Sequence, residues 1–383
     1  MKPLQQNKAA SAEPRRFSGL LWYFLKLGTI GFGGPIALAG YMQRDLVEKD
    51  HWFTSEEYLD GLAFSQLCPG PLAAQLAMYL GYVRGGLIGA TLVGGVFILP
   101  SFLMVVLLAA AYVNFGGLAW MSASFYGVGA AVIAIIAKSA IKLVKSAIKT
   151  DKLLWGIFLA MLISTAVTER EIVWLFLAGG LLALLVRSTP RLARARATCI
   201  LLFGGGSVAW NSTFMQLLVF FIKASLFVFG SGLAIVPFLH GGVVLEHHWL
   251  NERQFIDAVA VAMITPGPVV ITVAFIGYLV GGFTGAVAAG LGVFLPVYLL
   301  VVIFGPQYNR FAANPQLRAF VQGVTAAATG AIAGAVIVLA RRSITDVVTA
   351  AIAVLTLVLL LKWKIPEPVL IVAAGVAGVA LAR

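Results

Sequence analysis

Charged residues are scarce in this chain. Asp, Glu, Lys and Arg make up 11% of its 383 residues, whereas a soluble protein uses roughly 25% to cover its surface. Apolar residues reach 61%, and the mean hydropathy is +0.97. This composition excludes a string of water-soluble domains and indicates an all-α polytopic membrane protein.

Cysteine and the common catalytic motifs are also missing or nearly so. Cys68 and Cys199 are the only cysteines, too few for a disulfide framework or a cysteine metal site. The sequence has no HExxH zinc motif, no GxSxG in a strand–turn–helix setting and no GxxxxGK[ST] phosphate loop. We therefore expect no catalytic residue, no metal and no cofactor, and we expect a protein that is not an enzyme.

The charge that is present is unbalanced, with a formal net charge of +12. In a soluble protein this excess would suggest nucleic-acid binding. Here the basic residues cluster between apolar runs, where they set the orientation of the chain in the membrane. We expect membrane lipids and no nucleic acid as partners. Residues 1–16 are interpreted as a cytoplasmic N-terminal tail without a cleavable signal peptide.

The second half of the sequence repeats motifs of the first half. The segment His51–Asp60 reappears as His248–Asp257, at an offset of 197 residues. The same offset aligns Pro69-Gly70-Pro71 with Pro266-Gly267-Pro268, and an offset of 196 continues the alignment further on. Similarity between leucine-rich helices would not reproduce Trp, Asp and Pro-Gly-Pro in register, so we predict a duplication.

The duplication divides the chain into parts. We expect a first transmembrane repeat at 17–186, a linker at 187–213 and a second transmembrane repeat at 214–383. A weak apolar stretch at 199–210 would invert the second repeat if it crosses the membrane. Inversion places five basic residues of the second repeat inside and three outside, which favours inverted repeats by a small margin and leaves parallel repeats open.

Each repeat starts with an interrupted apolar span. The span Phe17–Ala39 contains a glycine-rich break with Gly33 and Gly34, and the span Phe214–Val236 contains one with Gly230. A helix follows in each repeat, and its start is indicated by the capping-box spacing of Thr54 with Glu57 and of Asn251 with Gln254. Later apolar segments lie near 86–113, 118–137, 153–167, 171–186, 284–304, 320–339, 346–361 and 367–382.

Pro-Gly-Pro inside an apolar run predicts a broken helix in each repeat. Proline lacks an N–H and clashes with the preceding turn, and the next helix then begins with free N–H groups at its positive end. An anion at the break would satisfy these groups. The alternative is a proline kink healed by Ser, Thr or water. The predicted substrate-binding breaks comprise Pro69, Gly70, Pro71, Pro266, Gly267 and Pro268, with Gly33, Gly34 and Gly230.

Four polar residues at matching positions complete the predicted substrate site. Lys26 and Lys223 each lie within the first span of their repeat, where a charge by default suggests function; the alternative is snorkelling to the interface. Gln75 and Thr272 follow the two breaks and offer neutral hydrogen bonds to an oxyanion, or hold helices together.

Two carboxylates also recur. Asp60 and Asp257 each stand nine residues before the Pro-Gly-Pro. A carboxylate near the start of a helix is favoured by the helix dipole, and the competing interpretation is a proton-coupling group. Gln66 has Met263 as its counterpart, so any role of Gln66 is asymmetric. A basic helical face is interpreted as contact with lipid headgroups; it comprises Lys138, Lys142, Lys145 and Lys149.

At this point the sequence resembles the long, two-domain form of the chromate ion transporter family. The residues that carry the resemblance are Phe32-Gly33-Gly34-Pro35, Ser65-Gln66-Leu67-Cys68-Pro69-Gly70-Pro71, Gln75, Gly81-Tyr82, Gly89-Ala90 and Leu99-Pro100-Ser101, with their second copies. The resemblance covers almost the whole chain. Many members have His shortly after Phe-Gly-Gly-Pro, whereas this sequence has Leu38, which puts a protonatable role for that position in doubt.

The resemblance implies a secondary transporter that exports chromate from the cytoplasm across the bacterial inner membrane, coupled to the proton gradient, and so confers chromate resistance. It also implies oppositely oriented halves. Sulfate is a tetrahedral dianion of similar size, so a sulfate-type oxyanion transporter is the first alternative. A membrane-embedded lipid-modifying enzyme and a membrane assembly subunit are alternatives of other classes. The oligomeric state is left open, with a homodimer among the options.

Overall fold

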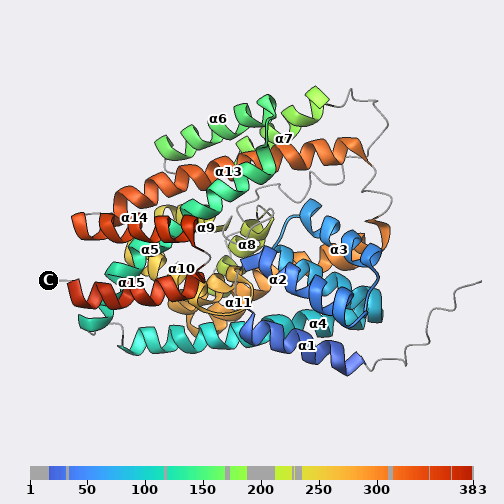
Figure 1. Cartoon of the computed structure of the whole chain (residues 1–383), viewed down its shortest axis with the longest axis horizontal. Coiled ribbons are helices and arrows are strands. Elements are labelled where there is room, and N and C mark those ends of the chain that lie inside the picture. Colours follow the sequence, from blue (N-terminus) through green and yellow to red (C-terminus); the bar gives the residue numbers. More distant parts are fainter. Residues whose placement is uncertain are drawn as a thin grey trace, which may run out of the picture.

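The structure is a computed structural model, and its described part is helical throughout (Figure 1). The described residues are 17–31, 34–115, 119–168, 173–187, 212–226, 228, 235–308, 314–344, 346–363 and 365–381. The expected N-terminal tail at 1–16, most of the linker at 187–213 and the apolar stretch at 199–210 lie outside them.

The same order of helices occurs twice. The first repeat contains α1 (Phe17–Ile30), α2 (Gly34–Met42), η1 (Gln43–Lys49), α3 (Ser55–Leu67), α4 (Leu72–Phe115), α5 (Ala119–Leu143), η2 (Val144–Ile148), α6 (Lys152–Thr168) and α7 (Val173–Arg187). The second contains α8 (Thr213–Ser225), α9 (Ile235–Leu239), η5 (His240–Glu246), α10 (Glu252–Ile264), η6 (Val269–Ile271), α11 (Thr272–Phe304), η7 (Gly305–Gln307), α13 (Pro315–Ser343), α14 (Val347–Lys362) and α15 (Glu367–Leu381). The expectation of two homologous all-helical repeats is confirmed.

Both predicted capping boxes are present. The hydroxyl of Thr54 accepts a hydrogen bond from the Glu57 N–H at 3.2 Å, and the Thr54 N–H donates to the Glu57 carboxylate at 2.8 Å. Asn251 and Gln254 make the same reciprocal pair at 2.8 and 3.0 Å. The two boxes fix where α3 and α10 begin, and therefore how many residues separate each start from the Pro-Gly-Pro.

The helices α4 and α11 are sharply bent at Gly85-Gly86 and Gly281-Gly282, equivalent positions of the two repeats at which the sequence analysis predicted no bend. Gly86 has φ +57° and Gly282 has φ +62°, a backbone region that suits glycine. Beyond the bend the two arms pass each other closely: a Cβ on Gly81 would lie 2.5 Å from the Gly89 carbonyl oxygen. Each long helix is therefore two arms in contact, which only glycine at the crossing permits.

The last two helices of each repeat pack on the other repeat. Helices α6 and α7 lie along α13, and α14 and α15 lie along α5 (Figure 1). Backbones touch at these crossings. A Cβ on Gly127 would lie 2.0 Å from the Ala374 carbonyl oxygen, and one on Gly323 would lie 2.3 Å from that of Gly179. Close approach through small residues is how membrane helices associate, and here it ties the repeats together.

The outer surface is apolar. Among the described residues, four helices are long and apolar enough to cross a membrane, namely Leu72–Phe115, Tyr126–Leu143, Thr272–Gln307 and Pro315–Arg341. Large apolar side chains such as Ile88, Leu107 and Val376 are exposed. A surface of this kind is suited to lipid, so the chain is a multi-pass membrane protein.

We predict that Gly323→Ala lowers stability because its methyl group would collide with the Gly179 backbone. The expected loss is about 1–3 kcal/mol, typical of overpacking. Gly95→Ala is the matched control, since a Cβ there meets nothing within 4 Å. The measurement is the thermal unfolding midpoint of each purified variant in detergent. Equal midpoints for the two variants would show that the α7–α13 crossing is not close-packed.

Candidate functional site

The first span of the first repeat is interrupted as predicted. Helix α1 ends at Ile30, and α2 begins at Gly34, which has φ +75°. A side chain at that φ is strained, which explains a glycine at this position. In the second repeat α8 ends at Ser225 and α9 begins at Ile235. Gly33 and Gly230 lie outside the described residues.

The Pro-Gly-Pro segments also stop their helices. Helix α3 ends at Leu67 and α4 starts at Leu72, while α10 ends at Ile264 and the chain resumes helical structure at Val269. The central glycines have φ +132° at Gly70 and +98° at Gly267, so each turn depends on glycine.

The two kinds of break meet across the repeats. The Gly70 N–H donates to the Val228 carbonyl oxygen at 2.6 Å, and the Gly267 N–H donates to the Gly31 carbonyl oxygen at 2.8 Å. Gly31 and Val228 are 197 residues apart, as are Gly70 and Gly267. The contacts are therefore reciprocal, as they are in any pair related by a two-fold axis. The N–H groups of Gly70 and Gly267 lie in the turns before the next helices, and in this conformation they are bonded to carbonyl groups of the other repeat.

Each Pro-Gly-Pro glycine also lies against the residue that follows the proline in the other repeat's long helix. A Cβ on Gly267 would lie 1.9 Å from the Ser101 hydroxyl, and one on Gly70 would lie 2.7 Å from a Val297 methyl group. Ser101 and Val297 occupy equivalent positions, 196 residues apart. Ser101 is fully buried and donates to the Gly28 carbonyl oxygen at 3.0 Å. The contact is therefore polar where Gly267 meets Ser101 and apolar where Gly70 meets Val297.

Gln75 and Thr272 are both buried beside the breaks. Gln75 is fully buried in the first turn of α4, and its side-chain amide donates to the Pro69 carbonyl oxygen at 2.7 Å. Its Oε1 is buried and has no hydrogen-bond partner in the described part of the chain. Thr272 opens α11 and is 1% exposed. The structure therefore brings both residues to the place where the sequence analysis expected them.

The two aspartates differ in their surroundings. Asp257 is 1% exposed and accepts a hydrogen bond at 2.8 Å from the hydroxyl of Tyr112, which belongs to α4 of the other repeat. Asp60 is half-buried. A buried carboxylate is costly unless it is hydrogen-bonded or protonated. Asp257 and Asp60 therefore differ in their chemical environment although they occupy equivalent positions in the two repeats.

Lys26 and Lys223 lie on the outer surface. Helix α1 buries Leu20, Phe24 and Leu27, and Lys26 is exposed on another face. Lys223 is likewise exposed, in the last turn of α8. The structure does not bring these two side chains to the breaks, and their role in binding stays a prediction.

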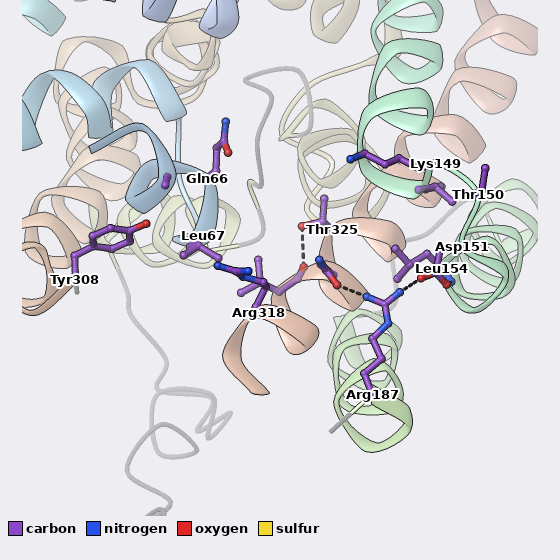
Figure 2. Close-up of a pocket in the computed structure, with 14 residues that line it drawn as sticks. Gln66, Leu67, Lys149, Thr150, Asp151, Leu154, Arg187, Tyr308, Arg318 and Thr325 are labelled. Carbon is purple, nitrogen blue, oxygen red and sulfur yellow. Dashed lines mark hydrogen bonds and ion pairs between the residues drawn. The ribbon is translucent and has the colours of Figure 1, made fainter. Parts of the chain in front are cut away.

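A cavity of about 620 Å³, called the basic cavity below, lies beside the end of α3 (Figure 2). Its polar lining comes from distant segments. These lining residues include Gln66, Lys149, Asp151, Arg187, Arg318 and Gln322. One oxygen of Asp151 caps α6 by accepting from the N–H groups of Leu153 and Leu154. The other pairs with Arg187, whose guanidinium also donates to Gln322.

The sequence analysis did not find this cavity. It placed Lys149 on a lipid-facing basic helix and counted Arg187 and Arg318 only as topology signals. Its one pointer was the unmatched Gln66, which lines the cavity. Among the described residues, no three His, Cys, Asp or Glu side chains come together as a metal site requires.

Comparisons with known proteins agree with this architecture. A profile of the chromate transporter family matches residues 18–184 and again residues 215–379. The chromate transport protein of Cupriavidus metallidurans is 58% identical over 368 residues, which cover 94% of this chain and 92% of that protein. The probable chromate transport protein of Synechococcus elongatus is 54% identical over 370 residues, 94% of each chain.

A chromate transport protein of Pseudomonas aeruginosa is 35% identical over 401 residues, which cover 98% of this chain and 95% of that protein. No solved structure matches this chain. The resemblance found in the sequence motifs is thereby confirmed. Since the family profile occurs twice and the relatives align over nearly their whole length, this chain belongs to the chromate transporter family.

Proposed function

We propose that the protein is a secondary transporter that exports chromate from the cytoplasm across the bacterial inner membrane, coupled to the proton gradient, and thereby confers chromate resistance. The observation that carries this proposal is the reciprocal contact between the broken helices of the two repeats at Gly70 and Gly267. Paired broken helices at a repeat interface are the arrangement of many secondary-transporter binding sites.

The breaks supply what an oxyanion needs. Chromate presents four oxygens that accept hydrogen bonds, and the helices after the two Pro-Gly-Pro turns present their positive ends there. The Gly70 and Gly267 N–H groups bond to carbonyl groups of the opposite repeat in this conformation. Transfer of these donors from carbonyl to oxyanion would couple binding to a change in the contact between the repeats. Gln75 is buried beside the first break, and Thr272 is buried at the start of the helix α11 that follows the second.

Asp257 is the better candidate for the coupling proton. It is buried against Tyr112 of the other repeat, so a change in its protonation would act directly on the interface between repeats. Asp60 is only half-buried, so we propose a smaller contribution of Asp60 to proton coupling. Lys26 and Lys223, being exposed, would contribute to the positive field that draws the anion.

We also propose inverted repeats with a cytoplasmic N-terminus. The reciprocal contacts support a two-fold relation between the repeats, and the distribution of basic residues favours an axis in the membrane plane. Inverted repeats would present the same break to opposite sides of the membrane, as alternating access requires.

Chromate flux is the direct test of the function. Purified protein reconstituted in liposomes should accumulate labelled chromate when a pH gradient is imposed, and a proton ionophore should abolish the accumulation. Labelled sulfate is the competing substrate. Flux of neither anion would rule out oxyanion transport, and flux of sulfate without chromate would favour the sulfate-type alternative.

We predict that Asp257→Asn uncouples transport. This variant should exchange chromate across the membrane but fail to accumulate it against a gradient, because the group that carries the proton is gone. Asp60→Asn is the matched comparison and should keep most of its gradient-driven accumulation. Uptake and exchange are measured in the same liposomes. Full accumulation by Asp257→Asn would remove this residue from the coupling mechanism.

Orientation is tested with single cysteines. In a background in which Cys68 and Cys199 are replaced by Ala, Arg253→Cys and Arg341→Cys each introduce one exposed thiol. Inverted repeats predict that a membrane-impermeant maleimide applied to intact spheroplasts labels position 341 and spares position 253. Labelling of 253 instead of 341 would establish parallel repeats.

A further inference from the structure

Each of the two matching aspartates lies beside a tyrosine of the other repeat. Asp257 of α10 accepts a hydrogen bond at 2.8 Å from the hydroxyl of Tyr112, near the end of α4. The position equivalent to Tyr112 is Tyr308, 196 residues later, and the position equivalent to Asp257 is Asp60, 197 residues earlier. The duplication therefore supplies two pairs, called the Tyr112–Asp257 pair and the Tyr308–Asp60 pair below.

Tyr308 lies close to Asp60. Its ring contacts Phe64, one turn after Asp60 on α3, edge-on with centroids 6.0 Å apart. Tyr308 follows the long apolar helix that ends at Gln307. Burial, and then the Asp60 carboxylate, raise the pKa of the Tyr308 hydroxyl, while Arg318 lowers it. A charged group shifts a pKa in this way only when it is near.

The two pairs have matching aromatic surroundings. The Tyr112 ring contacts Phe275 of α11 edge-on, with centroids 5.4 Å apart. The equivalent of Phe275 is Tyr79 of α4, which stacks on Phe64 at 5.7 Å and borders a cavity together with Tyr308. An aromatic ring of the long helix thus lies near the tyrosine in both places, so the fold offers both pairs the same kind of setting.

The two pairs nevertheless differ in their bonding. Tyr112 and Asp257 are joined, and Asp257 is 1% exposed. Within the described residues, neither the Tyr308 hydroxyl nor the Asp60 carboxylate makes a hydrogen bond, and Asp60 is half-buried. One pair is therefore closed in this conformation, and the equivalent pair is open.

The surroundings of Tyr308 leave room for movement. Two cavities border it, the basic cavity and one of about 240 Å³ that Tyr79 and Tyr82 also line. The backbone before it is the 3₁₀ turn η7, which contains Pro306, whereas α4 continues as a helix past Tyr112. A short 3₁₀ segment at the end of a helix often marks a hinge. The structure thus has space for a bond between Tyr308 and Asp60 that this conformation does not make.

Two unequal pairs are what alternating access needs. Two repeats of similar structure need not hold the same conformation, and an exchange of their conformations converts one state of a transporter into the opposite one. Applied to the two pairs, this exchange breaks the bond of Tyr112 and makes the bond of Tyr308. One hydrogen bond to a carboxylate is lost and one is gained, so the two states stay close in free energy.

We propose that Tyr112 and Tyr308 are the gate residues of transport, each closing on the aspartate of the other repeat in one of two alternating states. In the state described here the Tyr112–Asp257 pair is closed and the Tyr308–Asp60 pair is open. In the opposite state Tyr308 donates to Asp60, and Tyr112 releases Asp257. This inference rests on the proposed transport function and adds to it the residues that hold each state closed.

The test measures which pair is open with one reporter thiol at a time, in a background in which Cys68 and Cys199 are replaced by Ala. The reporters are Ala63→Cys and Ala260→Cys, at equivalent positions. Ala63 lines the basic cavity, while Ala260 lines the cavity beside Tyr112 and is 1% exposed. Labelling by a water-soluble maleimide in detergent reaches both ends of the protein. In the wild-type background Ala63→Cys should react faster than Ala260→Cys.

The two gate variants should shift labelling in opposite directions. Tyr112→Phe keeps the ring and removes the hydroxyl bonded to Asp257, so it should raise the labelling rate of Ala260→Cys. Tyr308→Phe should lower that rate, because it weakens the opposite state. Each change should be about tenfold, since a hydrogen bond to a charged group shifts an equilibrium by about that factor. Both variants should also slow chromate accumulation in liposomes several-fold.

The Tyr308→Phe result is the most discriminating. In this conformation the Tyr308 hydroxyl makes no hydrogen bond to any described residue. A merely structural role of Tyr308 therefore predicts no change on its removal, whereas the gate predicts a change in labelling and in transport. If Tyr112→Phe misfolds, Tyr308→Phe alone still decides between the two.

The matched control is Tyr298→Phe. The hydroxyls of Tyr298 and Thr91 form a hydrogen bond of 2.8 Å between the same two long helices, α11 and α4, without a carboxylate. This variant should leave the labelling rates of Ala63→Cys and Ala260→Cys unchanged. Elution of each variant as one symmetric size-exclusion peak, in wild-type yield, shows that it has folded.

The possible results separate the two proposals. Absence of chromate and sulfate flux in the wild-type protein overturns the transport function, on which the gate depends. Wild-type flux together with unchanged labelling in Tyr112→Phe and Tyr308→Phe overturns the gate alone. Faster labelling of both reporters in Tyr112→Phe would show general loosening of the helices and would likewise overturn the gate.

Discussion

Two backbone hydrogen bonds hold this structure together at its centre. The N–H groups of Gly70 and Gly267 belong to interrupted helices, and in a bilayer such groups must find a partner. Each finds it in the interrupted first span of the other repeat, at Val228 and Gly31. The four helix breaks therefore depend on one another. Each Pro-Gly-Pro turn donates a hydrogen bond to the broken first span of the other repeat, so the helices must be arranged to bring these breaks into contact.

The remaining packing follows from that meeting. With the breaks in contact, α6 and α7 reach α13, and α14 and α15 reach α5. Glycines at these crossings, such as Gly127 and Gly323, let backbones touch, which is the main source of helix association where lipid is as apolar as the side chains. The outer helices of each repeat therefore pack on the central helix of the other repeat.

Local chemistry was predictable from the sequence, and contacts between repeats were not. The capping boxes at Thr54 and Asn251 and the stops at Pro69 and Pro266 depend on neighbouring residues, so a motif suffices to find them. The partner of Gly70, the burial of Asp257 and the outward position of Lys26 depend on which helices pack together. The basic cavity was missed for the same reason, because the residues that line it, such as Arg187 and Arg318, are distant in sequence.

The reciprocal bonds also bear on stoichiometry. A polypeptide with only one repeat would expose an unpaired glycine N–H and an unpaired carbonyl at its own breaks, together with the uncovered faces of α5, α6 and α7. Both groups are complementary to a second such polypeptide, so a single repeat should self-associate in pairs before it is stable. Joining both repeats in one chain fixes their ratio at one to one and allows the two to diverge. The contrast between Ser101 and Val297 is a divergence that identical paired subunits could not have.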